Sequence, residues 1–504
     1  MRLPTFCVGC VLVEPVTEAD VRPPNVVIIF ADDMGWGDLG CNGATAIPTP
    51  AMDAIAADGA RFTDAHSASS VCTPSRYALL TGRYAWRGPL KSGVLMGHGP
   101  AIIEQDRPTI AGMLTAAGYA CGAFGKWHLG VGWHWRDGHV ETAFGPDARL
   151  AVARELEDGA EVDYERGFSD GPTTRGFDRF FGIAASLDMA PYCFLDQDRT
   201  LGVLDQPKQA YSPGQRPGLQ TAGWEDDQVD VRVTEESVRW LRERPGDEPF
   251  FLYLTPAAPH RPCVPPEFVR GRTGIGNRTD AVCLVDWMVA EIDRTLTEIG
   301  ARDNTIVIVT SDNGAPTGYI EDGRLEDHLP NGPFRGQKAD IWEGGHREPL
   351  LVRWPGHVSP GTVIDHPVGL VDLYATLADA CGVDPGTGGE DSTSRTDLLL
   401  GRAAAGDGSD LLVHHTLGGR FGLRMGRWKI EFTTGSGAGF TEPKGTAFDQ
   451  DHPVGQLYDL ETDPYETTDL WADRPDIVAD GYRRLQEICR TPDSGLPFGV
   501  TLGA

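Results

Sequence analysis

Residues 26–33 read Val-Val-Ile-Ile-Phe-Ala-Asp-Asp, and this stretch decides the fold class. Its apolar residues follow one another without alternating with polar ones, which is typical of a strand buried on both faces of a sheet. Comparable apolar runs occur at 250–254, 305–310 and 350–352. Strands of this kind predict an α/β fold, in which helices cover both faces of a central sheet.

Segments with helical periodicity separate the predicted strands. Between Asp280 and Ile299, apolar residues recur every three or four positions and therefore share one face of a helix. Helices are also predicted over 109–117 and 229–242. We expect a large sheet, mostly parallel but mixed, that is sandwiched by helices.

The pattern changes after Cys381. Residues 383–409 are rich in Gly, Asp, Ser and Thr, as in an exposed linker. Short strand-like segments and a closing helix follow, at 411–415, 422–425, 428–432, 456–460 and 477–489. We predict a catalytic domain over 24–390 and a C-terminal α+β subdomain with a short antiparallel sheet over 391–504.

Length and charge limit the classes of function. The 504 residues are more than one ordinary domain contains, which agrees with two domains. Acidic residues number 73 and basic residues 44, so the formal net charge is −29. Such a surface repels nucleic acid and anionic lipid at long range, and we expect no nucleic-acid partner. No segment approaches the roughly 20 apolar residues of a membrane span.

Residues 1–23 form a leader or the remnant of a signal peptide. Arg2 precedes an apolar run from Phe6 to Val13, which Glu14 ends early for the h-region of a signal peptide. Export to the periplasm or secretion is one expectation, and a cytoplasmic location stays open. The ten cysteines have irregular spacings and do not identify the compartment.

Polar clusters directly follow three of the predicted strands. Asp32 and Asp33 follow the first, Asp312 and Asn313 follow the strand at 305–310, and His260 follows the strand at 250–254. In open α/β sheets, sites form beyond the carboxyl ends of the strands. The Asp and Asn side chains supply oxygen ligands, which Ca²⁺ and Mg²⁺ prefer. The alternative for each pair alone is a loop or helix cap.

Three motifs follow one another in order along the chain. Residues 72–83 read Cys-Thr-Pro-Ser-Arg-Tyr-Ala-Leu-Leu-Thr-Gly-Arg, and residues 118–128 read Gly-Tyr-Ala-Cys-Gly-Ala-Phe-Gly-Lys-Trp-His. The third motif runs from 331 to 338 and into Trp-Glu-Gly-Gly at 342–345. In this order the motifs resemble the signatures of the formylglycine-dependent sulfatases of the alkaline phosphatase superfamily. The second departs from the family pattern at Cys121 and Phe124, neither of which is a charged catalytic group. The resemblance extends from Pro24 to the C-terminal helix.

The resemblance implies the cofactors and a role for each motif residue. Cys72 would be converted to formylglycine by a formylglycine-generating or anaerobic sulfatase-maturating enzyme. The modified residue would complete a shell around one cation, expected to be Ca²⁺ rather than Mg²⁺, with Asp32, Asp33, Asp312 and Asn313. Arg76 would fix the modified side chain, Lys126 and Lys338 would hold the sulfate oxygens, and His128 and His260 would form the acid/base pair.

The chemistry of a sulfate monoester explains this set of residues. The cation and the lysines neutralise the anionic ester, and the hydrated aldehyde supplies a geminal diol as nucleophile. His260 would protonate the departing alcohol oxygen. His128 would take the proton of the second hydroxyl, so that sulfate leaves residue 72 and the aldehyde is regenerated. A serine at position 72 would keep the sulfate as a stable ester.

The expected substrate is a sulfated saccharide, attacked by an exo-acting carbohydrate sulfatase. Trp133 and Trp135 are expected either to stack on sugar rings or to pack in the protein core, and Asp188 and His346 are candidates to bind sugar hydroxyls. Residues 33–40 resemble the corresponding stretch of galactosamine-6-sulfatases. The alternatives are an arylsulfatase of broad range, a formylglycine-dependent phosphodiesterase or phosphonate hydrolase, and a non-catalytic binder of sulfated glycans.

Overall fold

The computed structural model describes residues 22–138, 159–244, 246, 248–317, 328–402, 411–449 and 453–490. The predicted leader up to residue 21 and residues 403–409 of the predicted linker lie outside the described residues. Within the described part of the chain, none of the helices combines the length and the hydrophobicity needed to span a bilayer.

The dominant element is a mixed sheet of 11 strands. Its strand order is β12-β2-β11-β10-β1-β9-β3-β4-β5-β6, and β13 pairs with β2. Five adjacent strands at its centre are parallel: β10 (Thr305–Ser311), β1 (Asn25–Ala31), β9 (Phe250–Thr255), β3 (Ala120–Lys126) and β4 (Arg179–Ile183). The predicted α/β fold is confirmed.

The strands toward both edges include antiparallel pairs. β11 (Arg347–Arg353) runs antiparallel to β10, and β2 (Ala60–His66) runs antiparallel to β11. β12 (Thr362–Ile364) and β13 (Val368–Gly369) are parallel to β2, whereas β5 (Leu195–Asp196) and β6 (Arg199–Thr200) are antiparallel. The amino end of β11 therefore lies at the same edge of the sheet as the carboxyl ends of the central strands.

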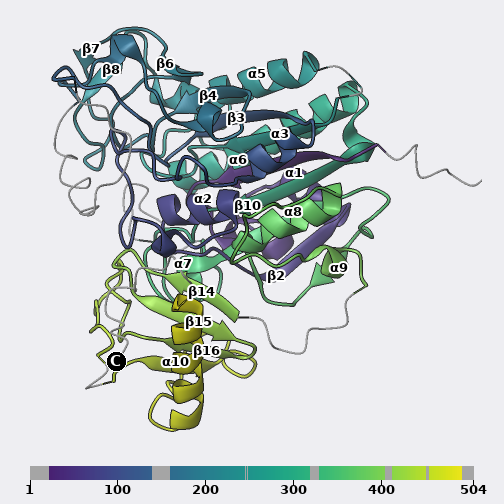
Figure 1. The fold of residues 1–504 in the computed structure, drawn as a ribbon, viewed down its shortest axis with the longest axis vertical. Coiled ribbons are helices and arrows are strands. Elements are labelled where there is room, and N and C mark those ends of the chain that lie inside the picture. Colours follow the sequence, from purple (N-terminus) through teal and green to yellow (C-terminus); the bar gives the residue numbers. More distant parts are fainter. Residues whose placement is uncertain are drawn as a thin grey trace, which may run out of the picture.

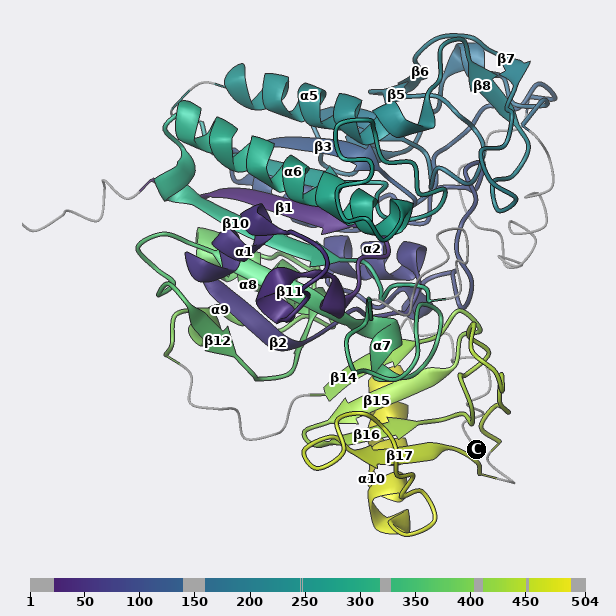
Figure 2. The ribbon, with the colours of Figure 1, turned by 180° about the vertical axis from the view of Figure 1, so that it is seen from behind.

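Helices cover both faces of this sheet (Figures 1 and 2). Successive side chains of a strand point to opposite faces. Val26, Ile28 and Phe30 share a core with α2 (Cys72–Thr81), α3 (Ile110–Ala116) and α8 (Leu373–Cys381). Val27 and Ile29 share a second core with α1 (Pro50–Ala57), α5 (Val229–Arg242) and α6 (Asn277–Glu298).

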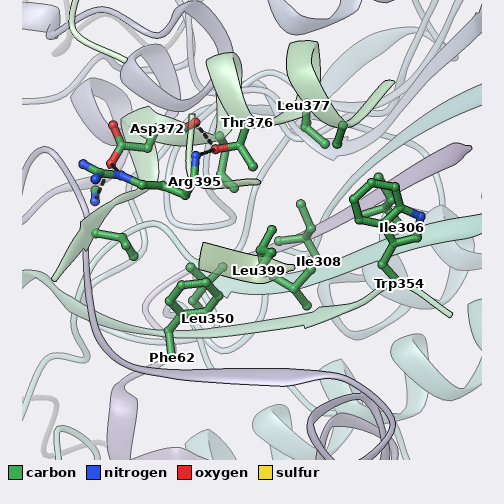
Figure 3. A pocket seen from close by; sticks show the side chains of 15 residues that line it. Phe62, Ile306, Ile308, Leu350, Trp354, Asp372, Thr376, Leu377, Arg395 and Leu399 are labelled. Atoms are coloured by element: carbon green, nitrogen blue, oxygen red, sulfur yellow. Dashed lines mark hydrogen bonds and ion pairs between the residues drawn. The ribbon is translucent and has the colours of Figure 1, made fainter. Parts of the chain in front are cut away.

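A small cavity of about 20 Å³ lies in the first core, between the sheet and α8. Figure 3 shows Ile306, Ile308 and Leu350 of the sheet facing Leu377 of α8 and Leu399 of α9 (Thr396–Leu399) across it. Its lining is predominantly apolar, and apolar cavities of this kind stay dry.

The C-terminal part forms a separate antiparallel sheet, seen below the large sheet in Figures 1 and 2. Its strands pair in chain order, from β14 (Leu411–His415) and β15 (Phe421–Met425) to β16 (Trp428–Glu431) and β17 (Gln456–Asp459). α10 (Pro475–Cys489) shares their core. The domain boundary at 390/391 stays a prediction, and Leu399 packs in the core of the larger sheet.

Candidate active site

The carboxyl ends of four adjacent parallel strands bring the predicted site residues together. Asp32 and Asp33 follow β1, Asp312 follows β10, Lys126 ends β3 and His260 follows β9. Backbone hydrogen bonds extend past the strand ends, because Asp32 N–H donates to the Ala258 carbonyl and Asp312 N–H to the Ala31 carbonyl. Loops that leave the sheet side by side therefore start in a fixed register.

Cys72 is the first residue of α2 and faces this edge of the sheet. Its Sγ lies 3.5 Å from Asp32 Oδ1 and 3.5 Å from Lys338 Nζ. Asp32, Asp33, Cys72 and His260 each offer a ligand atom, and these atoms all lie within 4.8 Å of one another. The structure therefore assembles the predicted nucleophile, two predicted metal ligands and a predicted acid/base residue.

Asp312 and Asn313 lie beside Asp33. The Asp33 N–H donates to Asp312 Oδ1 at 3.2 Å, and Asn313 Nδ2 donates to Asp33 Oδ1 at 2.6 Å. Asn313 Oδ1 is buried and has no hydrogen-bond partner among the described residues. A buried amide oxygen without a donor, next to several carboxylates, fits a hard cation.

Two buried lysines neutralise the carboxylates. Lys126 Nζ lies 2.6 Å from Asp32 Oδ2, and Lys338 Nζ lies 2.7 Å from Asp33 Oδ1. Burial alone would raise the pKa of Asp32, but the Lys126 ammonium, together with His260 and other cations, holds that pKa well below its usual range. Asp32 is therefore ionised, as a metal ligand must be.

Arg76 pairs with Asp312. Its Nε donates to Asp312 Oδ2 at 2.9 Å, its Nη2 lies 2.7 Å from the same oxygen, and its guanidinium lies 5.1 Å from the centre of the Phe30 ring. Burial raises the pKa of Asp312, and Arg76 opposes this rise. Arg76 thus fixes a predicted metal ligand, whereas its predicted contact with a modified residue 72 stays a prediction.

The unmodified Cys72 is poorly suited to be a nucleophile. Burial, together with the nearby Asp312 carboxylate, raises the pKa of its thiol well above the usual value. The thiolate is the reactive form of cysteine, so an unmodified thiol here is inert.

The two predicted acid/base histidines have different environments. His128 Nε2 donates to the Leu95 carbonyl at 2.7 Å, and His128 Nδ1 has no partner among the described residues. Burial, followed by the Lys126 charge, lowers the pKa of His128 well below its usual value. His260 Nδ1 donates to the Arg261 carbonyl at 2.7 Å, and its Nε2 lies 3.6 Å from Asp33 Oδ2.

Two site residues have strained backbone. Asp33 has a φ of 67° and His128 a φ of 56°, both in the left-handed region that residues other than glycine rarely occupy. Strained backbone of this kind clusters at functional sites, where the surrounding structure holds it in place.

Comparisons with known proteins identify the family. The family model described as Sulfatase matches residues 24–383. The chain belongs to the sulfatase family. It is 31% identical to an N-acetylgalactosamine-6-O-sulfatase of Bacteroides thetaiotaomicron, over 93% of this chain and 92% of the relative. It is 32% identical to human arylsulfatase A, over 95% of this chain and 90% of the relative.

Solved structures agree with this assignment. A sulfatase structure from work on glycosaminoglycan metabolism by Bacteroides thetaiotaomicron has a TM-score of 0.79 and 30% identity, covering 93% of this chain and 99% of that chain. A phosphonate monoester hydrolase of Agrobacterium radiobacter shares the fold, with a TM-score of 0.54 and 19% identity over 92% of this chain and 94% of that chain. This sulfatase is a sulfuric ester hydrolase with an alkaline-phosphatase-like fold.

Some of the residues predicted to contact a sugar lie where no sugar could reach them. Trp133 is fully buried in the core, donates from Nε1 to the Gly97 carbonyl and packs edge-on against Phe168, and Trp135 belongs to the same core. The predicted stacking of a sugar on these two rings is therefore wrong, because their faces pack against protein. Both tryptophans are residues of the hydrophobic core.

His346 also differs from its prediction. Its Nδ1 lies 3.0 Å from His66 Nδ1, and its Nε2 lies 3.1 Å from the Ile341 carbonyl. The side chain is only 1% exposed, so a sugar hydroxyl does not reach the ring of His346.

Asp188 retains a free acceptor. Its Oδ2 lies 2.7 Å from Arg216 Nη1 and 3.4 Å from Arg261 Nε, whereas its Oδ1 has no partner among the described residues. Arg261 directly follows His260 in the chain, so Asp188 contacts the loop that carries His260. Its predicted contact with a sugar hydroxyl stays a prediction.

The groups that fix the catalytic side chains were not predicted from the sequence. These groups include the carbonyls of Leu95 and Arg261, which select the histidine tautomers, and Arg216, which pairs with Asp188. A backbone carbonyl carries no residue-type signal, and Leu95 lies 33 residues from His128. The tertiary fold alone brings such partners together.

Proposed function

We propose that this sulfatase is an exo-acting carbohydrate sulfatase whose nucleophile is a formylglycine made by oxidation of Cys72. The position of Cys72 carries the proposal, since its Sγ lies 3.5 Å from both Asp32 Oδ1 and Lys338 Nζ. An oxygen on the same side chain would stand between a metal ligand and an ammonium group. The hydrated aldehyde supplies, when formed, a hydroxyl for attack on sulfur.

We further propose one Ca²⁺, held by Asp32, Asp33, Asp312, Asn313 and the modified residue 72. When bound, such an ion acidifies a hydroxyl that it contacts and neutralises sulfate charge. The ionised Asp32 and the buried Asn313 Oδ1 support a hard cation. Oxidation of Cys72 removes the one sulfur ligand, which a softer ion would prefer. Mg²⁺ is less favoured because it demands near-octahedral geometry.

Activity after chelation tests the cation. Exhaustive treatment with a chelator should abolish turnover, and Ca²⁺ should restore more of it than Mg²⁺ does. Full activity with no ion retained would contradict the proposal.

The protein groups then have separate tasks. Lys126 and Lys338 would turn from Asp32 and Asp33 toward the sulfate oxygens and stabilise charge in the transition state. His260, with its Nδ1–H fixed on a carbonyl, would donate a proton from Nε2 to the departing sugar oxygen. His128, with Nδ1 free, would accept a proton in the step that releases sulfate from residue 72.

The substrate proposal is a sulfate ester on galactose or a hexosamine. The likeness to an N-acetylgalactosamine-6-O-sulfatase supports a saccharide. Asp188 Oδ1 has no partner among the described residues, lies on a side chain that contacts Arg261, and would bind a sugar hydroxyl. We also propose that a maturation enzyme oxidises Cys72 and that the protein acts in the periplasm or outside the cell. An intact N-terminus on protein from the native cytoplasm would contradict that location.

A matched set of substrates tests the function. Matured protein is assayed on galactosamine 6-sulfate, glucosamine 6-sulfate, nitrophenyl sulfate and galactosamine 6-phosphate. We expect the highest kcat/KM on a sulfated sugar. Highest values on nitrophenyl sulfate would indicate an arylsulfatase, and preference for the phosphate would indicate a phosphoryl hydrolase. Binding of sulfated sugar without turnover would indicate a glycan-binding protein.

A further inference from the structure

A second buried cluster of ligand-type side chains lies beside the segment that leads to Cys72. It contains His66 at the end of β2, Glu343 and His346 of α7 (Glu343–His346), and His414 of β14. We call these four residues the histidine cluster. His66, Glu343 and His346 offer ligand atoms within 4.8 Å of one another, and the His414 ring stacks on His346 with centroids 3.7 Å apart. Each residue is at most 3% exposed.

The hydrogen bonds leave two nitrogen lone pairs facing each other. His66 Nε2 lies 2.7 Å from Asp64 Oδ1, and His346 Nε2 lies 3.1 Å from the Ile341 carbonyl. Carbonyl and carboxylate oxygens accept, so each Nε2 carries the proton of its ring. The two Nδ1 atoms, 3.0 Å apart, would then both be bare. Two bare nitrogens at this distance repel each other. Either a metal ion or a bridging proton must therefore lie between them.

His414 supplies a second, independent observation. Neither of its ring nitrogens has a hydrogen-bond partner among the described residues, although the side chain is only 2% exposed. Buried polar atoms without partners are rare, and an additional ion or water explains them.

The charges around the cluster accommodate a cation. Glu343 contacts Arg347 at 2.7 Å and Lys429 at 3.1 Å, and Lys429 is also held by Glu466 at 2.6 Å. Lys429 thus keeps a carboxylate partner if Glu343 turns to an ion. Burial raises the pKa of the neighbouring Glu431, which can release its proton when positive charge arrives.

We propose that the histidine cluster binds a divalent transition metal ion such as Zn²⁺, separately from the hard cation of the active site. Imidazole nitrogens with one carboxylate suit Zn²⁺. Asp64 behind His66 and the Ile341 carbonyl behind His346 are the partners that orient metal-bound histidines. Two nitrogens at about 2.0–2.1 Å from a tetrahedral ion stand roughly 3.3 Å apart, so the pair widens by a few tenths of an ångström.

Such an ion would tie the segment before Cys72 to the C-terminal sheet. Ser67 N–H donates to the His346 carbonyl at 2.8 Å, and Ser70 N–H donates to the His415 carbonyl at 3.0 Å. The metal would join β2, α7 and β14 on both sides of this segment. We therefore assign it a structural role, independent of the proposed function.

Metal analysis tests the proposal. Because the site is buried, the full-length protein is produced in medium with Zn²⁺, desalted into excess Ca²⁺ to fill the active site, and analysed for zinc. We expect about one Zn²⁺ per chain in the wild type. His346→Leu should lose this zinc, whereas His357→Leu, at an exposed histidine outside the cluster, should retain it. Equal zinc in the wild type and His346→Leu would overturn the assignment.

Two further measurements keep the test decisive if His346→Leu fails to fold. His414→Phe keeps the ring stack on His346, and it should weaken zinc retention. Wild-type protein produced with Co²⁺ should show visible ligand-field bands without thiolate charge-transfer bands. No retained metal in the wild type would show that a proton bridges His66 and His346, and thiolate bands would place the metal on cysteine. Either result would overturn the proposal.

Discussion

The two active-site histidines are each fixed by a backbone carbonyl, but through different nitrogens. His128 donates from Nε2 to Leu95, so its Nδ1 is a bare lone pair, and its lowered pKa keeps the ring neutral. His260 donates from Nδ1 to the Arg261 carbonyl, and its Nε2 lies 3.6 Å from Asp33 Oδ2. Their geometry therefore suits a base at His128 and an acid at His260.

Substitution of each histidine separates the two roles. His260→Ala should lower turnover of a sulfated sugar by roughly 10²–10⁴, the usual contribution of a general acid. Nitrophenyl sulfate should lose far less, because a phenolate leaves without protonation. His128→Ala should impair both substrates, because release of sulfate from residue 72 is common to both, and mass spectrometry should find sulfate retained there.

The loss of turnover on the sugar, compared with the loss on nitrophenyl sulfate, decides whether His260 is the general acid. Equal losses on the sugar and on nitrophenyl sulfate in His260→Ala would remove His260 as the acid. Lys338, which lies 3.5 Å from Cys72 Sγ, would then become the candidate.

Among single residues, the sequence predicts those with charged or metal-binding side chains at motif positions. Asp32, Cys72, Lys126 and Lys338 meet in space because they lie in motifs that end at one sheet edge. The prediction for His346 was wrong because its side chain packs against His66, a neighbour distant in the sequence, and is too buried to meet a sugar. Such pairing depends on packing between segments that no local pattern records.

Among the elements, strands buried on both faces were the most predictable. β1, β9 and β10 appear as continuous apolar runs because no side chain of theirs meets water. An apolar run does not indicate whether a strand runs parallel or antiparallel to its neighbours. Residues 350–352 were therefore predicted as a strand, but their antiparallel orientation was not. β3, with the sequence Ala-Cys-Gly-Ala-Phe-Gly-Lys, was not predicted because small residues and glycine are poor strand formers.

Packing between α8 and the sheet gives a prediction for an element. Leu377 of α8 is 1% exposed and lines the small cavity in Figure 3. Leu377→Ala would enlarge this cavity and should cost about 2–5 kcal/mol of stability, measured by urea unfolding. Val363→Ala at an exposed position of β12 is the control and should change stability by less than about 0.5 kcal/mol. Equal effects would show that α8 does not contribute to the core as described.

For the whole molecule, buried neutral histidines predict loss of stability in acid. Burial lowers the pKa of His415 to about 4, against about 6.5 in an unfolded chain. Between these values the unfolded chain binds the proton and the folded chain does not, so stability falls as pH falls from about 6.5 to about 4. For His415 alone this amounts to roughly 3 kcal/mol.

Unfolding as a function of pH measures this effect. His415→Gln should show a shallower decline in the free energy of unfolding between about pH 6.5 and pH 4 than the wild type does. The exposed His357→Gln is a matched control and should follow the wild type. Parallel curves for His415→Gln and the wild type would show that His415 does not remain neutral in the folded protein.

The chemical state of residue 72 in active protein decides whether formylglycine is the nucleophile. Protein from a host with a maturation enzyme is labelled with a hydrazide, digested and analysed by mass spectrometry of the peptide that contains residue 72. We expect an aldehyde at this position, in a fraction that rises in proportion to specific activity, and inactive protein with intact Cys72 from a host without the enzyme. Fully active protein that contains only unmodified Cys72 would show that formylglycine is not the nucleophile.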